Sequence, residues 1–320
     1  MSQPDCTLVI INWNTQALLA QCLASIAIGA NTVSTEVFVV DNGSSDGSAA
    51  MVRTDFPAAH LIANTHNRGF SYANNQAVVL AQGRYILFLN SDATLSSGCL
   101  DNMVAFMDQH PNVGLAGPQL QHADGTFQNS VASIPSLLSE LGQKALLRLL
   151  APQRYYGRHF KPSAPLAVES LVGAALLVRR EMVDQIGSYD DNFFFYFEET
   201  DWCLRAREAQ WQVYFLPDVI IYHGQGKSAK TRPDAARIEY WRSRYYFFKK
   251  HYSGWKNLIL RVGLLTRLAV VLPINALMGL WQTKAKQKAK NNWAILRWHL
   301  QGCPTRIGLP GLRKSGQVIT

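Results

Sequence analysis

Residues 39–47 read Val39-Val40-Asp41-Asn42-Gly43-Ser44-Ser45-Asp46-Gly47, an apolar run that ends in a carboxylate and a polar turn. The same order returns in Ile86-Leu87-Phe88-Leu89-Asn90-Ser91-Asp92, and an aromatic run precedes Glu198-Glu199-Thr200-Asp201. Short apolar runs that alternate with helical spacing predict parallel strands joined by helices. Because ligands bind at the carboxyl ends of such strands, we expect these polar clusters to share one site.

The segments around this stretch extend the alternating pattern. We expect strands at 8–11, 37–40, 60–63, 85–89, 171–178, 212–215 and 219–222. Helices are expected near 18–26, 71–81, 97–108 and 180–186, with shorter ones after Ser45 and from the acidic cluster at 198–201. Residues 120–170 carry few strand signals and predict an insertion that forms an acceptor site or a lid. The fold class is therefore α/β, with a Rossmann-like and mainly parallel sheet.

Length and composition narrow the class of protein. The chain has 320 residues, of which 48% are hydrophobic, so it can bury a substantial core. Five scattered cysteines without a Cys-x-x-Cys pair predict a reduced, cytoplasmic chain with no disulfide framework or zinc ribbon. The first residues lack a basic run, so we expect no signal peptide.

Charge divides the chain into two parts. Residues 1–150 hold 5 Lys/Arg against 10 Asp/Glu, and residues 151–320 hold 26 against 12. No acidic residue follows Glu239, whereas 15 Lys/Arg do. The apolar run 268–281 is shorter than the ~20 residues that a spanning helix needs. Trp241, Tyr245, Phe247 and Phe248 lie among these basic residues, a combination that fits helices at a membrane interface. We therefore expect residues 237–320 to form a basic, amphipathic helical extension that lies on an anionic membrane surface.

Each cluster has a chemical interpretation and a structural alternative. Asp41 can accept a hydrogen bond from a pyrimidine, and Asp92 can bind Mg²⁺ or Mn²⁺, but both positions also suit turns and helix caps. Aromatic neighbours would raise the pKa of a carboxyl group in the cluster at 198–201, as a general base requires; the alternative is an acidic first helical turn. His223 can complete a metal site, and Gly224, Gly226 and Lys227 after it can approach phosphate. Asn67, Arg68, Gly69 or Asn74 can also contact phosphate.

The order of five motifs resembles that of family 2 glycosyltransferases of GT-A fold, in the rhamnosyltransferase-like branch, over about residues 6–250. The motifs are Val9-Ile10-Ile11-Asn12-Trp13-Asn14, Val40-Asp41-Asn42-Gly43-Ser44-Ser45-Asp46-Gly47-Ser48, Asn67-Arg68-Gly69-Phe70-Ser71-Tyr72-Ala73-Asn74-Asn75, Leu87-Phe88-Leu89-Asn90-Ser91-Asp92 and Gly173-Ala174-Ala175-Leu176-Leu177-Val178-Arg179-Arg180. The resemblance implies a catalytic part at 1–236. Its nucleotide-binding half is expected at about 1–118 and its acceptor-binding half at about 119–236.

The resemblance also implies roles for single residues. Asp92 would be the last residue of a DXD-like metal motif that begins at Asn90, with His223 as a second metal ligand. Glu198-Glu199 replaces the usual Glu-Asp pair, which makes Glu199 the expected base and Asp201 the fallback. The remaining expected contacts are with the nucleotide-sugar (Asn12, Asn14, Asp41, Asn67, Gly69, Asn74, Asn90 and Ser91) and with the acceptor (Gly173 and Trp202).

The resemblance implies inverting transfer of a sugar, with L-rhamnose from dTDP-L-rhamnose as the expected donor, to a cell-surface polysaccharide or lipid-linked glycan. The enzyme would use Mg²⁺ or Mn²⁺ and lie on the cytoplasmic face of the plasma membrane. Three alternatives remain open: a UDP-sugar donor, an inactive sugar-nucleotide-binding protein, and a nucleic-acid-binding protein that uses the basic tail. The acidic N-terminal half argues against nucleic acid.

Overall fold

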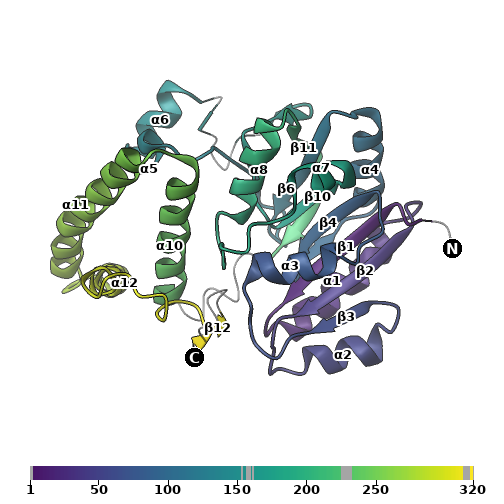
Figure 1. Cartoon of the computed structure of the whole chain (residues 1–320), viewed down its shortest axis with the longest axis horizontal. Helices are drawn as coiled ribbons and strands as arrows, with labels where there is room; N and C mark the ends of the chain where they lie inside the picture. The colour runs from purple at the N-terminus through teal and green to yellow at the C-terminus, as the bar shows by residue number, and fades with distance from the viewer. Residues whose placement is uncertain are drawn as a thin grey trace.

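The computed structural model describes residues 3–152, 154–155, 160, 162–224, 233–312 and 318–319. Its centre is one mixed sheet in the order β3-β2-β1-β4-β10-β6-β11-β5, with β8 paired to β11 (Figure 1). A group of helices stands beside the sheet, and the N-terminus lies at the far end of the molecule from them (Figure 1). This architecture confirms the predicted α/β fold with a mainly parallel central sheet.

Four parallel strands form the N-terminal half of the sheet: β1 (Cys6–Asn12), β2 (Thr35–Asp41), β3 (His60–Ala63) and β4 (Tyr85–Asn90). Their register places Asn12 beside Asp41, and Ile11 beside Asn90. The polar residues that end these strands therefore meet at one edge of the sheet, as the sequence predicted.

Side chains alternate between the two faces of these strands. Leu8 and Ile10 pack on one face with helices α1 (Gln16–Gly29), α2 (Ser48–Asp55) and α4 (Cys99–Gln109). Val9 and Ile11 pack on the other face, with helices α3 (Phe70–Val78), α7 (Arg180–Ile186) and α8 (Glu198–Glu208). Both faces are covered, which explains why the strands are apolar throughout.

The second half of the sheet differs from the expectation in two places. A fully buried strand, β6 (Val113–Gln121), was not predicted, because its sequence Val-Gly-Leu-Ala-Gly-Pro-Gln-Leu-Gln is poor in β-branched residues. Two expected strands form one, β11 (Gln212–His223), with an irregularity between Leu216 and Ile220. The remaining strands are β5 (Ala93–Leu95), β8 (Leu166–Ala167) and β10 (Ala175–Arg179), of which β10 is antiparallel to β4 and β6.

The segment expected as an insertion has sparse secondary structure. It contains helices α5 (Leu137–Leu141) and α6 (Lys144–Leu150), and its strand β7 (Val131–Ala132) pairs with β9 (Ser170–Leu171). Ser136 caps α5 through a hydrogen bond from the backbone N–H of Ser139.

Three long helices form the C-terminal part: α10 (Pro233–His251), α11 (Gly254–Met278) and α12 (Thr283–Leu300). A short hairpin of β12 (Gly311–Leu312) and β13 (Val318–Ile319) follows. Helix α10 runs across the expected boundary at 236/237, and its Phe247 and Phe248 are fully buried in a cluster that includes Phe193 and Phe197. The C-terminal helices are therefore packed onto the sheet part by a shared core.

This packing corrects the sequence interpretation of the aromatic run. Trp241, Tyr245, Phe247 and Phe248 were expected at a membrane interface, but the structure buries all four. Helix α11 is also longer than the predicted run of 14 residues: it has 25 residues and is long and apolar enough to cross a membrane by length and composition alone. One face of α11 still packs inward, through Leu260, Leu264 and Leu268.

Candidate active site

The ends of β1 and β2 are joined by side-chain hydrogen bonds. The Asn12 amide donates to Asp41 Oδ1 (3.0 Å) and to Ser44 Oγ (3.1 Å), and Asp41 Oδ2 accepts the Ser44 N–H (3.1 Å). Asn14 Oδ1 accepts a hydrogen bond from the Ser45 N–H (2.8 Å). The backbone of Asn14 has a positive φ of 54°. The structure thus brings together three predicted nucleotide-contacting residues, Asn12, Asn14 and Asp41, and gives each a part in holding the turn.

A second amide network supports the loop before α3. The buried Asn42 amide donates to Asn67 Oδ1 (2.9 Å) and to the carbonyl of Gly69 (3.2 Å). Gly69 has a φ of +88°, and a Cβ there would lie 2.7 Å from the Phe194 ring. Asn74 is buried, and its Oδ1 has no hydrogen-bond partner among the described residues. Asn67 and Gly69 therefore shape this loop.

Asp92 and His223 meet at the same edge of the sheet. The pairing of β5 with β11 sets His223 opposite Ala93, next to Asp92. His223 Nε2 lies 3.3 Å from Asp92 Oδ1 and 3.4 Å from Asn90 Nδ2. Ser91 Oγ is 2.9 Å from Thr15 Oγ1, which in turn donates to Asn12 (2.6 Å). These contacts link the expected metal motif to the nucleotide side.

Gln128 determines which nitrogen of His223 carries a proton. Its NH₂ group donates to the His223 carbonyl (2.6 Å), so its Oε1 is the atom that faces His223 Nδ1 at 3.0 Å. An amide oxygen only accepts, and Nδ1 must therefore carry the proton and leave the lone pair on Nε2. That lone pair lies 3.4 Å from the Asn90 NH₂ group and 3.3 Å from Asp92 Oδ1, another acceptor, and a cation could bind to both acceptor atoms.

These two side chains suit a divalent cation that also takes oxygen ligands from substrate. No group of three or more His, Cys, Asp or Glu side chains that could hold a metal occurs among the described residues. Mg²⁺ is commonly held by one or two protein carboxylates together with substrate phosphates and water, so a sparse protein ligand set is sufficient. The Gly224 N–H donates to the Asp92 carbonyl (2.7 Å) and fixes the two segments.

Glu199 lies in the first turn of α8 and faces a cavity of about 440 Å³. Residues 129–148 contribute to the lining of this cavity, together with Tyr196 and Tyr240. The lining thus draws on the segment expected to form an acceptor site or lid. Gly173 lies against Glu199, since a Cβ on Gly173 would be 3.3 Å from Glu199 Cγ. The carbonyl of the next residue, Ala174, accepts a hydrogen bond from the Asn90 N–H (2.9 Å). This bond joins the segment next to Glu199 to the strand end that precedes Asp92.

The two adjacent glutamates, Glu198 and Glu199, both have raised pKa values. Burial and then the charge of Glu199 raise the pKa of Glu198 well above its ordinary value, and Glu198 Oε2 has no hydrogen-bond partner in the described part of the chain. Burial also raises the pKa of Glu199, but backbone hydrogen bonds, one of them from Gly173, oppose the rise. Both carboxyl groups therefore hold a proton more strongly than an exposed glutamate does, and a backbone hydrogen bond from Gly173 favours the ionised form of Glu199.

The backbone before Glu198 adopts an uncommon conformation. Tyr196 and Phe197 have φ values of +74° and +71°, in the left-handed region that bulky residues rarely occupy. Two such residues in sequence indicate local strain, which is typical of functional sites. This backbone turn precedes α8 and places Glu199, in the first turn of the helix, at the cavity.

The position of Asp201 argues against its expected role as the fallback base. Its side chain is fully buried and pairs with Arg205 (2.9 Å), Lys250 (2.7 Å) and His251 (2.7 Å). Burial alone would raise the pKa of Asp201, but hydrogen bonds from His251 and Lys250 and the charge of Arg205 outweigh it and lower the pKa. Asp201 ties α10 to α8.

We expect Asp201→Asn to destabilise the fold, because the change leaves partly buried cations without their carboxylate. Removing one member of a buried ion pair costs ~3–5 kcal/mol, which urea denaturation would measure. The lowered pKa means that this stabilisation is complete above the ordinary carboxyl range and is lost as the pH falls through the lowered pKa. Asp218→Asn, an exposed change in β11, is the matched control. Equal unfolding midpoints for the two variants would contradict this role.

Trp202 also departs from the expectation. The sequence placed it against the acceptor, but its side chain is fully buried and packs on Phe88 and Tyr189. Its indole N–H donates to the Gly187 carbonyl (2.9 Å). Glu199 lines the cavity, whereas Trp202, three residues later in α8, lies in the core of the sheet part.

Several residues of the site were not found from the sequence. Gln128, Asn129 and Tyr240 lie near Glu199 or His223, but no motif marks them. Gln128 and Asn129 were covered only by the general expectation of an acceptor site or lid. The expected contact of Lys227 and its neighbours with phosphate lies outside the described residues.

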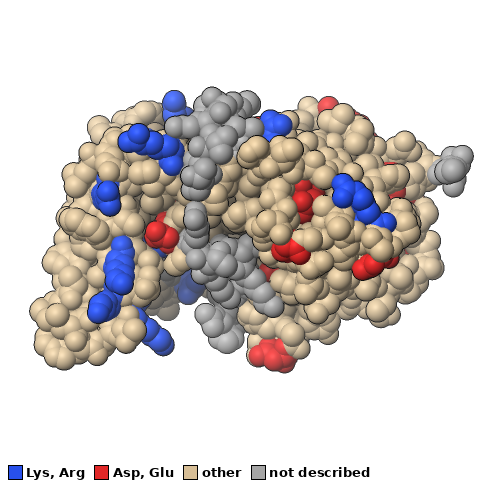
Figure 2. All heavy atoms as spheres, turned by 90° about the horizontal axis from the view of Figure 1, so that it is seen from below, with Lys and Arg blue, Asp and Glu red and all other residues tan. Residues whose placement is uncertain are grey.

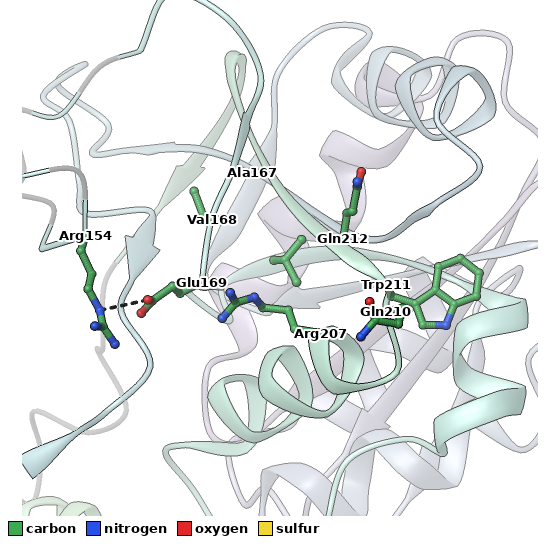
Figure 3. Close-up of a pocket in the computed structure, with 9 residues that line it drawn as sticks. Arg154, Ala167, Val168, Glu169, Arg207, Gln210, Trp211 and Gln212 are labelled. Atoms are coloured by element: carbon green, nitrogen blue, oxygen red, sulfur yellow. Dashed lines mark ion pairs between the residues drawn. The ribbon is translucent and has the colours of Figure 1, made fainter.

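Another cavity, of about 560 Å³, lies beside the start of β11 (Figure 3). Glu169 pairs there with Arg154 (3.0 Å), and Arg207 and Trp211 complete much of the wall (Figure 3). None of the predicted site residues lines this cavity, so it stands apart from the catalytic groups.

A family model described as "Glycosyl transferase family 2" matches residues 7–187. The chain belongs to glycosyl transferase family 2. The matched region spans β1 to α7 and contains Asp41, Asp92 and Gly173, so it covers both the nucleotide side and part of the acceptor side.

Curated relatives of this family 2 chain act on sugars. The N-acetylglucosaminyl-diphospho-decaprenol L-rhamnosyltransferase of Mycobacterium tuberculosis is 26% identical over 278 residues, which are 82% of this chain and 90% of that protein. The dTDP-rhamnosyl transferase RfbF of Shigella flexneri is 24% identical over 180 residues, 55% of this chain and 56% of that protein. These relatives support sugar transfer in general.

Solved structures establish the fold. The mannosyltransferase PcManGT from Pyrobaculum calidifontis, in complex with GDP-Man and Mn²⁺, superposes with a TM-score of 0.54 at 16% identity, over 95% of this chain and 88% of that chain. GalNAc-T7 with UDP, GalNAc and Mn²⁺ gives a TM-score of 0.53 at 13% identity, over 77% and 50%. The chain therefore has the GT-A fold that the resemblance implied.

Proposed function

We propose that this chain is an inverting glycosyltransferase that moves L-rhamnose from dTDP-L-rhamnose to a hydroxyl group of a lipid-linked glycan. The observation that carries the proposal is the position of the Glu199 carboxylate at a cavity. Glu199 packs against Gly173, whose neighbour Ala174 is hydrogen-bonded to Asn90 beside the Asp92–His223 pair. Two relatives are rhamnosyltransferases, one of them an N-acetylglucosaminyl-diphospho-decaprenol L-rhamnosyltransferase, and they support this sugar and acceptor class.

In the proposed reaction, Glu199 accepts the proton of the acceptor hydroxyl. The acceptor oxygen then bonds to the anomeric carbon from the side opposite the diphosphate. The bond from that carbon to the diphosphate oxygen breaks, and its electron pair leaves with the nucleotide. A positioned base of this kind contributes ~10²–10⁴ to the rate.

Asp92 and His223 would hold the divalent cation, Mg²⁺ or Mn²⁺. When bound, the cation supplies positive charge that neutralises the departing diphosphate. Two solved structures of this fold contain Mn²⁺, which supports the same use here. Asn12, Asn14, Asp41, Asn67, Gly69, Asn74, Asn90 and Ser91 remain the residues that we propose at the nucleotide-sugar.

Donor competition would test this proposal. Purified protein with Mn²⁺ and a diphosphate-linked N-acetylglucosaminyl lipid should release dTDP from dTDP-L-rhamnose and form a rhamnosylated lipid. Release of UDP from a UDP-sugar, with no reaction of dTDP-L-rhamnose, would support the UDP-sugar alternative. Nucleotide binding without turnover of either donor would show an inactive sugar-nucleotide-binding protein.

Gln128 gives a prediction about the metal. Gln128→Leu removes the acceptor that holds the proton on His223 Nδ1, so the Nε2 lone pair is no longer presented to the cation. Loss of such supporting contacts typically weakens metal affinity ~10–100-fold. The dissociation constant of dTDP measured in Mn²⁺ should rise by that factor, whereas the constant measured in EDTA should not change. An equal loss of dTDP affinity in EDTA would show that the substitution damages the fold in general.

We also propose that the enzyme lies on the inner face of the plasma membrane through its C-terminal helices, and not through the buried aromatic residues of α10. Exposed apolar side chains lie on α11 and on the turn after it. They include Ile274, Leu277 and Trp281, which are 51%, 61% and 77% exposed. Figure 2 shows Lys and Arg spread over the C-terminal helices, while Asp and Glu lie mostly on the sheet part. Apolar side chains among basic ones suit an anionic lipid surface.

Vesicle flotation would test this location. Full-length protein should float with phosphatidylglycerol vesicles at low salt and less at high salt, because salt screens the attraction. Replacing Ile274, Leu277 and Trp281 by Ser should reduce flotation, whereas Val79→Ser with Leu80→Ser, which changes exposed residues of the sheet part, should not. Protein that stays at the bottom of the gradient at low salt would overturn the membrane proposal.

A further inference from the structure

A cavity of about 630 Å³ lies among α10, α11 and α12. Its described lining contains four basic residues and no acidic one: Arg237, Arg244, Arg267 and Lys288. Apolar side chains of α11 line it too, among them Leu264, Leu268 and Val271. The cavity therefore combines positive charge with an apolar wall, as a ligand that is anionic at one end and apolar at the other requires.

Arg244 has unused hydrogen-bond donors at this cavity. It is 7% exposed, and its Nη1 donates to Glu140 at 3.0 Å. Its guanidinium carbon lies 4.6 Å from the centre of the Trp241 ring, so an aromatic ring covers a flat face. Nε and Nη2 have no hydrogen-bond partner within the described part of the chain. Leaving buried charged donors unmatched is costly, and a phosphate group would match them in the guanidinium plane.

Arg237 adds a second charge beside Arg244. Burial, and then the charge of Arg244, lower the pKa of Arg237. Its Nη2 donates to the Asn292 oxygen at 3.1 Å, a neutral partner that does not offset the charge. The two arginines therefore create a positive field that an anion would stabilise.

This cavity adjoins the one that contains Glu199. Tyr196 and Tyr240 line both cavities. Glu140 lines the Glu199 cavity and pairs with Arg244, which lines the basic one. A single molecule that occupies both would have one end near the general base and the other among the C-terminal helices.

We infer that the basic cavity binds the diphosphate of a polyprenyl-diphosphate-linked acceptor. This inference rests on the proposed function. The acceptor's sugar would reach Glu199, its diphosphate would contact Arg237, Arg244, Arg267 and Lys288, and its first isoprene units would contact Leu264, Leu268 and Val271. Free inorganic phosphate would leave the apolar wall unused, and the sharing of Tyr196 and Tyr240 with the Glu199 cavity favours an acceptor over a membrane phospholipid.

Binding of farnesyl diphosphate, a short soluble probe, tests the site by calorimetry on the full-length protein. Because Arg244 is buried and paired, Arg244→Gln can alter folding, so the deciding variant is Arg267→Gln with Lys288→Gln. Both of those residues are exposed. Loss of two charged contacts should weaken binding at least about tenfold. Arg297→Gln with Lys290→Gln, which changes exposed residues of α12 outside the lining, should leave binding unchanged.

Competition and kinetic measurements decide the inference. Farnesol should not bind, and the KM for the lipid-linked acceptor should rise in Arg267→Gln/Lys288→Gln while dTDP affinity in Mn²⁺ stays constant. Equal displacement of farnesyl diphosphate by phosphatidylglycerol would show a phospholipid site and overturn the inference. An unchanged acceptor KM in an active enzyme would also overturn it and leave the proposed function intact. Farnesyl diphosphate binding that the variant weakens, in a protein that transfers no sugar, would support the site and contradict the proposed function.

Discussion

Glu199→Gln should abolish most of the turnover and leave donor binding intact. The amide keeps the size and polarity of the side chain but cannot accept the proton of the acceptor hydroxyl. Removal of a positioned base costs ~10²–10⁴ in rate, so kcat should fall within that range. The dissociation constant of dTDP in Mn²⁺ should stay the same, because Glu199 lies on the cavity side and not at Asp92.

The pH dependence of the reaction separates a base from a structural residue. Burial raises the pKa of Glu199 above its ordinary value of 4.5, and protonated Glu199 cannot act as a base. The rate of the parent enzyme should therefore decline as the pH falls through this raised pKa, and Glu199→Gln should lose that decline. Glu208→Gln, an exposed change at the other end of α8, is the control. A Glu199→Gln enzyme with the parent rate would refute the assignment.

Asp92→Ala should abolish transfer and weaken binding of the nucleotide-sugar in Mn²⁺. The change removes the carboxylate that faces His223 Nε2 at 3.3 Å, and with it one of the two proposed cation ligands. A cation at the diphosphate supplies several kcal/mol of transition-state stabilisation, so the loss should be on the order of 10³ or more in kcat/KM.

Titration with metal tests whether Asp92 acts through a cation. The parent enzyme should lose activity in EDTA and regain it with Mn²⁺ or Mg²⁺. Asp92→Ala should be inactive in both conditions, and Asp55→Ala, an exposed change at the end of α2, should behave as the parent. Full activity of the parent in EDTA would contradict the metal proposal, whatever the effect of Asp92→Ala.

Local sequence patterns were sufficient to predict the nucleotide side of the fold. Apolar runs that end at Asn12, Asp41 and Asn90 are parallel strands, and a parallel sheet brings strand ends to one edge without further information. Strand β6 could not be found in this way, because its glycines and proline give no local strand signal. Its conformation depends on its neighbours β10 and β11 in the sheet.

The acidic cluster shows what a local pattern cannot determine. The sequence predicted a helix that begins near Glu198, and α8 begins there. Which carboxylate faces the cavity depends on what packs against the other sides of the helix. Lys250 and His251 of α10 pair with Asp201, and the core closes over Trp202, so Glu199 is the residue that faces the open side.

The sequence by itself determined the family, the parallel strands and the polar residues at their ends, because each follows from short-range periodicity and motif order. Only the tertiary structure decided which distant groups meet. Asn90 and His223 are 133 residues apart, and Gln128 comes from the irregular segment between them. The aromatic residues of α10 are likewise buried because the C-terminal helices share a core with Phe193 and Phe197, which precede α8. Burial is a property of packed surfaces that periodicity does not encode.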